Sequence, residues 1–295
     1  MSAHEESARI LSVAVDAIGG TPRSGQVEMA QAVDRAIDEE IHLLVQAGTG
    51  TGKSLGYLAP AIAHAVLDDE AVVVATATLA LQAQLAGKDI PAALTAAEKV
   101  LPRRPRAAVL KGRHNHACLH KVRGGSSRPD QDMLLDDAES SAAGSAGKGT
   151  DQASELGAEV IALRQWAEQQ AAENGVGDRD DAPAHSQQAW DQVSMRANEC
   201  LGAQNCPFGP QCLAERARER ARDADIVVTN HAMLAIDAMN GGTLLPEHDV
   251  VVIDEAHEVA DRFTGAASVD LWPGRLSTVA RQGLTWLDDD LGADL

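Results

Sequence analysis

The eight residues from Ala47 to Ser54 have the composition of a loop that binds the phosphates of a nucleotide. They fit the pattern [AG]-x4-G-K-[ST] and are Ala47, Gly48, Thr49, Gly50, Thr51, Gly52, Lys53 and Ser54. The three glycines allow the backbone to curl with its N–H groups pointing inward. Lys53 would reach the β- and γ-phosphates and Ser54 would hold Mg²⁺. The sequence therefore predicts an ATP-binding loop here, whereas the alternative is an ordinary glycine-rich turn.

The segments on either side of this loop support the first interpretation. Residues Ile41–Gln46 form a short apolar run that predicts a buried strand, and residues Leu55–Val66 are apolar and Ala-rich, as in a helix. Strand, glycine-rich turn, Lys-Ser and helix occur in the order that a phosphate loop requires. The N-terminus of the helix adds a favourable electrostatic environment for a polyphosphate.

A second group of candidate catalytic residues follows the apolar run from Asp249 to Ile253. Asp254 would hold Mg²⁺ through its water shell, and Glu255 would orient and deprotonate the attacking water. His257 would link the state of the phosphates to a bound strand. The alternative is a solvated pair of carboxylates at a helix start, which the upstream phosphate loop makes less favourable.

Two further polar positions are candidates for the nucleotide site. Arg23 and Gln26 precede the loop by about 20 residues, and a Gln amide can donate to and accept from an adenine edge at once. A polar helix start explains the pair equally well in isolation. His231 follows the apolar segment Asp225–Thr229, at the rim where α/β sheets bind ligands, although a core or capping role is also open.

The remaining apolar runs predict further strands and an α/β fold. Ala71–Ala75 leads into Thr76 and Thr78, whose hydroxyls could contact a nucleic-acid backbone, while Thr78 could instead cap the next helix. Residues 107–110 predict another strand, which leads into Lys111 and Arg113. Residues 1–20, 27–39, 154–170 and 214–224 predict helices.

The four cysteines form a second chemical site. They are Cys118, Cys200, Cys206 and Cys212, the last three at a C-x5-C-x5-C spacing in a loop rich in Pro and Gly. We expect a cytoplasmic protein, in which four thiols serve as metal ligands rather than disulfides. The spacing departs from the C-x2-4-C knuckle of structural zinc. An iron–sulfur centre and zinc both remain possible on this ground.

The charge is strongly acidic but unevenly distributed. The formal net charge is −19, and more than half of it lies between residues 124 and 195, whereas residues 103–123 contain seven Lys or Arg and no acid. The net charge therefore does not exclude a nucleic-acid partner. The sequence contains neither a membrane-spanning run nor a signal peptide. Residues 124–153, rich in Gly, Ser, Ala and Asp, are expected to be disordered.

Taken together, these motifs resemble the XPD/DinG family of superfamily 2 DNA helicases. The resemblance rests on Arg23-x-x-Gln26, the phosphate loop, residues 76–85, Lys111-Gly-Arg113, the four cysteines, residues 226–231 and the DEAH box at residues 254–257. It implies 5′→3′ movement along single-stranded DNA, driven by ATP and Mg²⁺, with a role in DNA repair. It also implies a [4Fe–4S] cluster on the four cysteines and DNA contacts by Thr76, Thr78, Gln84, Lys111 and Arg113.

The resemblance further implies a domain organisation. Residues 1–110 and 223–265 would form a RecA-like P-loop motor domain, interrupted by an iron–sulfur insertion at 111–222, and residues 266–295 would begin an arch-type domain. The family also needs a second motor domain in cis, with an arginine finger that is typically worth about 10³–10⁵ in turnover. We therefore expect this chain to bind ATP, and single-stranded DNA or forks, without unwinding DNA alone. The alternative is a metal-stabilised nucleic-acid-binding or redox-sensing module with a vestigial nucleotide site.

Overall fold

The computed structural model describes residues 3–17, 19–21, 23–48, 52–124, 149–268 and 273–284. The helices are α1 (Ala3–Ala17), α2 (Ser24–Asp38), α3 (Lys53–Leu67), α4 (Leu79–Gln84), α5 (Ile90–Glu98), α6 (Leu119–Gly124), α8 (Gly149–Ala172), α9 (Gln187–Val193), α10 (Leu213–Arg222), α11 (His231–Met239), α12 (Val259–Ala267) and α13 (Pro273–Leu284). The strands are β1 (Val72–Thr76), β2 (Ala107–Val109), β3 (Ile226–Asn230) and β4 (Val250–Ile253).

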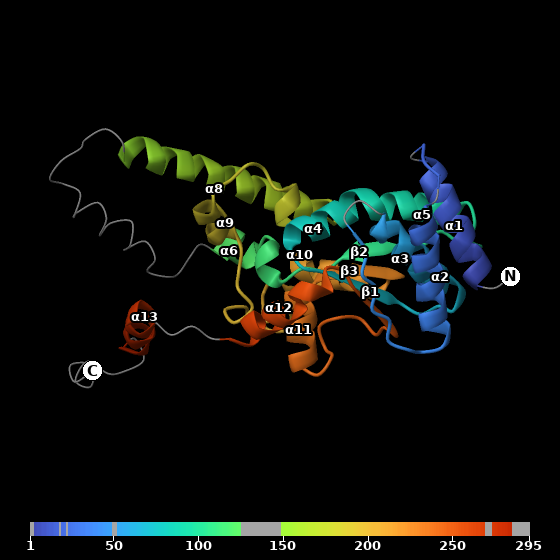
Figure 1. The fold of residues 1–295 in the computed structure, drawn as a ribbon. Coiled ribbons are helices and arrows are strands. Elements are labelled where there is room, and N and C mark those ends of the chain that lie inside the picture. Colours follow the sequence, from blue (N-terminus) through green and yellow to red (C-terminus); the bar gives the residue numbers. More distant parts are fainter. Residues whose placement is uncertain are drawn as a thin grey trace.

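These four strands form one parallel sheet in the order β2-β3-β1-β4 (Figure 1). The expected α/β fold with a parallel sheet is confirmed. The register pairs Thr76 with Asn230 and Ala75 with Ile253, so the three strands β3, β1 and β4 end at the same level. Their carboxyl ends therefore share one edge of the sheet, which is where α/β folds place their ligands.

Helices cover both faces of this sheet, as an all-parallel sheet requires. Alternate side chains of the central strands point to opposite sides: Val72 and Val74 pack in the core with α1, α3 and α5. Val73 and Val227 instead pack against Ala221 of α10 and other residues on the opposite face. Central strands buried on both faces explain why β1 and β3 are almost continuous runs of apolar residues.

The helices that follow the strands begin where the sequence supplies a capping side chain. Thr78 accepts a hydrogen bond from the backbone N–H of Leu81 (3.2 Å), and Asn230 accepts one from Met233 (3.0 Å). A single π-helical turn (Leu85–Asp89) joins α4 to α5. It lies just before Pro91, which has no N–H to donate and would crowd the preceding carbonyls of an α-helix.

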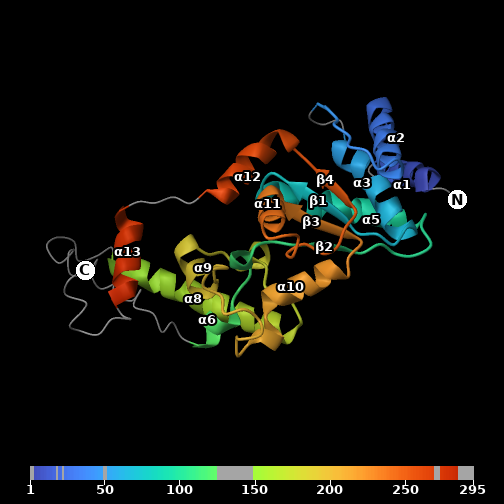
Figure 2. The same ribbon diagram turned by 90° about the horizontal axis from the view of Figure 1, so that it is seen from below.

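Residues between β2 and β3 build a second unit with its own core, lying beyond one edge of the sheet (Figures 1 and 2). Trp190 is fully buried between the long helix α8 and its neighbours, and its indole N–H donates to the His114 carbonyl (2.7 Å). The C-terminal end of α8 is held by Arg216 of α10, which donates to the Ala171 carbonyl (3.1 Å). Cationic groups at this end also suit the helix dipole.

The predicted strand at Ile41–Gln46 is wrong. Residues 41–48 form no strand, and Leu44 is 94% exposed. Helix α2 ends in a Schellman motif: Glu40 has a φ of 52°, and the N–H of Ile41 bonds the Ala36 carbonyl (3.0 Å). Apolar composition favoured a strand here, but a strand also needs ladder hydrogen bonds, and this segment makes none with the neighbouring edge strand β4.

Two other sequence predictions fall partly or wholly outside the described residues. Thr49, Gly50 and Thr51 lie outside them, as does most of the predicted disordered stretch at 124–153, whose last residues instead belong to α8. The predicted helices and the other four predicted strands correspond to elements of the structure within a few residues. Among the described helices, none has the length and apolarity needed to cross a membrane.

One buried carboxyl in this fold predicts a pH-dependent stability. Burial raises the pKa of Asp34 from 3.8 to about 6, opposed by the influence of Ser7 and of His4, whose Nδ1 lies 3.1 Å away. The folded state thus binds this proton more tightly than the unfolded state. The stabilisation from this group is fully present below about pH 4 and is lost as the pH rises through 6.

We expect Asp34→Asn to raise the melting temperature at pH 8 by about 2–4 °C, which corresponds to roughly 1 kcal/mol in a chain of this size. Between pH 4 and 7 the variant should show a flatter stability profile than the unmodified chain, measured by thermal unfolding followed with circular dichroism. Asp16→Asn, at an exposed position, is the matched control. Identical pH profiles for the two variants would show that Asp34 does not titrate in this range.

Candidate nucleotide site and cysteine pocket

The ion pair between Lys53 and Glu255 joins the phosphate loop to the DEAH box. The Lys53 ammonium lies 2.7 Å from Glu255 Oε1, although 202 positions separate the two residues in the chain. The hydrogen bond from Lys53 lowers the pKa of the Glu255 carboxyl, and the same contact raises the pKa of Lys53. Both side chains are partly exposed, so a ligand can reach them. The two motifs predicted to act together therefore meet in space.

The sheet explains why the acids reach this point. The Asp254 N–H donates to the Ala75 carbonyl (2.9 Å), which continues the ladder between β1 and β4 by one residue. Glu255 then takes a left-handed conformation with a φ of 54°, and its N–H bonds Asp254 Oδ1 (3.1 Å). This turn carries the Glu255 side chain toward α3. A positive φ is uncommon for a residue with a Cβ and is concentrated at functional turns.

Asp254 is the more buried of the two acids. Burial raises its pKa, and Lys53 opposes the shift. Behind it, the fully buried ring of His231 bonds the Asp254 carbonyl through Nε2 (2.9 Å). Burial lowers the pKa of His231, which keeps the ring neutral. His231 thus holds the backbone that carries Asp254, whereas His257 is exposed and lies 3.5 Å from Glu255 Oε2.

Gln26 contacts the phosphate loop directly. Its side-chain amide is buried and donates to the Gly52 carbonyl (3.0 Å). Gly52 has a φ of 82°, and a Cβ at this position would lie 2.5 Å from the Gln26 amide nitrogen. Only glycine fits here, because of both the backbone conformation and this close approach. In this structure Gln26 therefore supports the last turn of the loop before Lys53.

The residues predicted to contact DNA differ in their accessibility. Gln84 is exposed and Thr78 is partly buried at the start of α4, on the same edge of the sheet as the acids. Thr76 is fully buried and donates a hydrogen bond to the Thr78 carbonyl (3.1 Å). Of these three, Gln84 presents the most accessible polar group.

Lys111 and Arg113 occupy the junction between the sheet and the cysteine-rich unit. The Lys111 ammonium is buried and lies 2.7 Å from both Asp178 Oδ1 and Asp180 Oδ2. Arg113 pairs with Glu215 of α10. Burial alone would lower the pKa of Arg113, but Glu215 offsets it and the net shift is upward. In this conformation both cations are neutralised by partners within the chain.

Other basic side chains of the segment 103–123 are also paired with acids of the chain. Arg103 pairs with Asp225 (2.8 Å) and Arg123 with Glu168 (2.7 Å). The local excess of positive charge in the sequence is therefore offset in the fold by acids that are distant along the chain. The acid-rich insertion supplies several of these partners, namely Glu168, Asp178 and Asp180.

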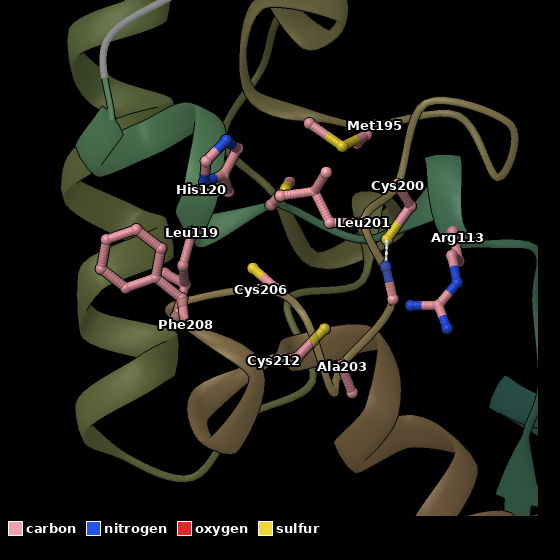
Figure 3. Close-up of a pocket in the computed structure, with 12 residues that line it drawn as sticks. Arg113, Leu119, His120, Met195, Cys200, Leu201, Ala203, Cys206, Phe208 and Cys212 are labelled. Carbon is pink, nitrogen blue, oxygen red and sulfur yellow. Dashed lines mark hydrogen bonds between the residues drawn. The ribbon is translucent and has the colours of Figure 1, made fainter.

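The four cysteines line a single pocket, together with Arg113, Met195 and Phe208 (Figure 3). Cys118 lies just before α6, Cys212 precedes α10, and the other two lie on the loop between α9 and α10. All four are free thiols and partly buried. Burial raises the pKa of Cys118. The Gly202 N–H approaches the sulfur of Cys200 (3.4 Å), which is the kind of contact that stabilises a thiolate.

The thiols are gathered in one pocket but are not tightly clustered. Within the described ranges, no group of three or more His, Cys, Asp or Glu side chains is close enough to hold a metal ion. One tetrahedral zinc, with Zn–S bonds of about 2.3 Å, would need its sulfurs within about 4 Å of one another.

Several contacts of the site were not foreseen from the sequence. The role of Gln26 on the loop, the acids opposite Lys111 and the backbone contact of His231 all depend on which segments become neighbours. The acid-rich composition of the insertion, opposite a basic segment, was the one available signal for the Lys111 and Arg113 pairs. Nothing in the local sequence identified their individual partners.

Comparison with known proteins places this site in a family. The DEAD_2 family model matches residues 167–276. The chain is 47% identical over 280 residues to a protein of Mycobacterium tuberculosis named ATP-dependent helicase DinG, covering 92% of this chain and 40% of that protein. It is 35% identical to the ATP-dependent DNA helicase YoaA of Escherichia coli, covering 82% of this chain and 34% of that protein.

A more distant relative gives the same result. The ATP-dependent DNA helicase DinG of Photobacterium profundum is 30% identical over 264 residues, covering 84% of this chain and 34% of that protein. The chain spans two fifths or less of the length of these curated relatives. With the phosphate loop and the DEAH box joined at one sheet edge, and with these similarities across most of its length, the chain belongs to the DinG-like helicase family.

Proposed function

We propose that this chain carries the nucleotide-hydrolysing motor domain of a DinG-type ATP-dependent DNA helicase. The observation that carries the proposal is the contact between Lys53 and Glu255, because it brings the phosphate loop to the acids of the DEAH box. Folding has no evident need for this ion pair. Partly exposed pairs contribute about 0–1 kcal/mol, so its placement is better explained by chemistry at the site.

Lys53, Glu255 and His257 would have different roles in ATP hydrolysis. The phosphates of ATP would displace Glu255 from Lys53, because the polyphosphate carries more negative charge than one carboxylate. The released Glu255 is then available to orient and deprotonate the attacking water, while Lys53 stabilises the charge that develops on the phosphates. His257, next to Glu255, is placed to sense this exchange. Arg23 would contact the base, and Gln26 would do so once its hydrogen bond to the Gly52 carbonyl opens.

The residues around Asp254 fit a bound Mg²⁺. Desolvation raises the pKa of the partly buried Asp254 carboxyl, and a cation beside it would stabilise the charged form. Ser54, in the first turn of α3, and Asp254 would hold the ion, both through hard oxygen atoms. When bound, Mg²⁺ supplies charge neutralisation at the β- and γ-phosphates.

The cysteine pocket fits an iron–sulfur cluster by its donor set. Four free thiols line one pocket, one just before α6 and three along the loop before α10, and no other cysteine exists in the chain. In a cluster each thiolate binds a different iron atom, so the sulfurs stand farther apart than around one zinc ion. We therefore propose that Cys118, Cys200, Cys206 and Cys212 hold a [4Fe–4S] cluster. A zinc ion is the less favourable occupant of this pocket.

The DNA path would follow the carboxyl edge of the sheet and the junction with the cysteine-rich unit. Gln84 and Thr78 can reach a phosphate backbone from α4, whereas Thr76, Lys111 and Arg113 would need their present contacts to open first. We propose single-stranded DNA, at forks, as the substrate and 5′→3′ as the direction. The rest of the enzyme, including a second motor domain, would be required in cis for unwinding.

The competing interpretation, a binding or redox-sensing module with a vestigial nucleotide site, is less well supported. A vestigial site has no reason to keep Lys53 on Glu255 and Asp254 at the carboxyl end of the sheet. Lys53, Asp254 and Glu255 are all present, and Lys53 contacts Glu255.

Freeing Lys53 from its intramolecular partner should improve nucleotide binding. We expect Glu255→Gln to tighten ATP binding by up to about fivefold, the equivalent of a partly exposed ion pair, while abolishing hydrolysis in the complete enzyme. Lys53→Ala should weaken binding at least tenfold. Fluorescence titration with a labelled ATP analogue measures both, and Arg262→Ala, which removes an exposed ion pair on α12, is the control. Weaker binding by the Glu255 variant would contradict the proposed displacement.

The cluster proposal is tested by metal content. Anaerobically purified protein should be brown, with broad visible absorption, and should contain iron and labile sulfide. Cys200→Ser should lose most of the iron and the colour, whereas Met195→Leu, which changes a sulfur in the same pocket that cannot act as a thiolate ligand, should retain both. Colourless protein with one zinc per chain, or full iron content in the Cys200 variant, would refute the assignment.

The role of Gln84 is tested by DNA affinity. Gln84→Ala should weaken binding of single-stranded DNA by about two- to tenfold, equivalent to one hydrogen bond. The slope of affinity against salt concentration should not change, because a neutral amide releases no counterions. Fluorescence anisotropy gives both quantities, with Gln188→Ala, exposed on α9, as the control. Unchanged affinity in the Gln84 variant would remove this residue from the DNA path.

A further inference from the structure

Tyr57 is the one tyrosine of the chain, and it stands beside the nucleotide site. It is the fifth residue of α3, and only 3% of the residue is exposed. Its ring belongs to the core formed by α1, α3 and α5. Packing explains the ring, because neighbouring positions of α3 are apolar, but it does not explain why this residue carries a hydroxyl.

The hydroxyl is located between the two residues that we propose to hold Mg²⁺. Ser54 and Tyr57 are three residues apart on α3 and so share one face of the helix. The Tyr57 hydroxyl is close enough to Ser54 and to Asp254 to interact with both side chains. A tyrosine hydroxyl carries its proton at neutral pH and can therefore act as a donor.

This hydroxyl lacks a hydrogen bond of normal geometry. The hydroxyl oxygen is buried, and no described residue forms a hydrogen bond with it. Buried hydroxyl groups are nearly always hydrogen-bonded. The two polar groups beside it are Ser54 and Asp254, so a small rearrangement at either residue would satisfy it.

We propose that Tyr57 is a positioning residue for Mg²⁺ in the nucleotide site, an inference that rests on the proposed function. In the cation-bound state, Ser54 uses a lone pair on the metal and its hydroxyl proton needs an acceptor, which the Tyr57 oxygen provides. Tyr57 in turn donates its proton to the Asp254 carboxylate. One hydroxyl thereby fixes the orientation of both residues and links helix α3 to the end of β4.

The proposed hydrogen bonds from Ser54 to Tyr57 and from Tyr57 to Asp254 also act on the Asp254 carboxylate. Donation from Tyr57 would orient the Asp254 carboxylate toward the cation and would satisfy the buried hydroxyl at the same time. Among the described residues that act on the Tyr57 hydroxyl, Asp254 is present and Glu255 is not. Tyr57 therefore acts on the metal-binding acid and not on the acid that activates water.

The test compares the unmodified chain with Tyr57→Phe, which removes only the hydroxyl and keeps the ring. Binding of a fluorescent ATP analogue is titrated at increasing Mg²⁺ and, separately, in EDTA. We expect the Mg²⁺ concentration for half-maximal effect to rise about three- to tenfold in the variant, equivalent to one or two hydrogen bonds. Affinity in EDTA and the melting temperature should not change, since no packing is lost. A purely structural role would alter these two quantities instead.

The control is Thr95→Val, which removes a hydroxyl on α5 that bonds the Pro91 carbonyl, away from the nucleotide site. It should leave the Mg²⁺ dependence unchanged. Suppose that Mg²⁺ strengthens binding of the analogue to the unmodified chain, and that Tyr57→Phe needs the same Mg²⁺ concentration for half-maximal effect. The positioning role of Tyr57 is then wrong, while the proposed nucleotide site stands. If the unmodified chain shows no Mg²⁺-dependent binding, the proposed site fails, and the inference fails with it.

Discussion

The central strand β1 is the constraint on which the site depends. It pairs with β3 on one side and β4 on the other, and its last residues set the level at which both neighbours end. Because the three strands are parallel, the side chains that follow them collect at one edge. Asp254 arrives there through a backbone bond to Ala75, and Asn230 starts α11 at the same level. The chemistry of the edge therefore follows from strand register, with the loops contributing only the final turns.

The position of β4 makes this arrangement asymmetric. β3 and β1 are buried on both faces, whereas β4 is an edge strand whose residues alternate between partly buried and exposed. The acids thus stand at the end of the least enclosed strand, where a nucleotide can reach them. His231 compensates from behind, because a neutral buried ring holds the Asp254 backbone without bringing another charge to the site.

Periodicity and motif spacing were sufficient to predict most of the fold. The apolar runs of β1 and β3 and the Ala-rich helix α3 are locally consistent with their structures, and local consistency is what a sequence can reveal. The segment 41–46 shows the limit of this reasoning. Its composition matches a strand, but composition cannot say whether a neighbouring edge will pair with it, and here the helix cap at Glu40 leads into an unpaired segment.

For the site, the sequence predicted the chemical groups better than their contacts. Lys53 and Glu255 were expected to act on the same nucleotide, and their side chains are in contact. Lys111 and Arg113 were expected to face a polyanion, yet each is paired with acids of the insertion. The sequence around a Lys or Arg does not identify the acid with which it will pair. Only the folding of the insertion against β2 decides which carboxylates reach it.

The buried ion pair at Lys111 affects how the sheet and the insertion between β2 and β3 can move relative to each other. Lys111 follows β2 almost directly, and its partners Asp178 and Asp180 belong to the insertion. Separating a buried cation from its carboxylates costs about 3–5 kcal/mol, so the sheet and the insertion cannot drift apart in small steps. The ion pairs at Lys111 therefore connect the sheet and the insertion rigidly, so that a displacement of the insertion would be transmitted to the carboxyl end of β2.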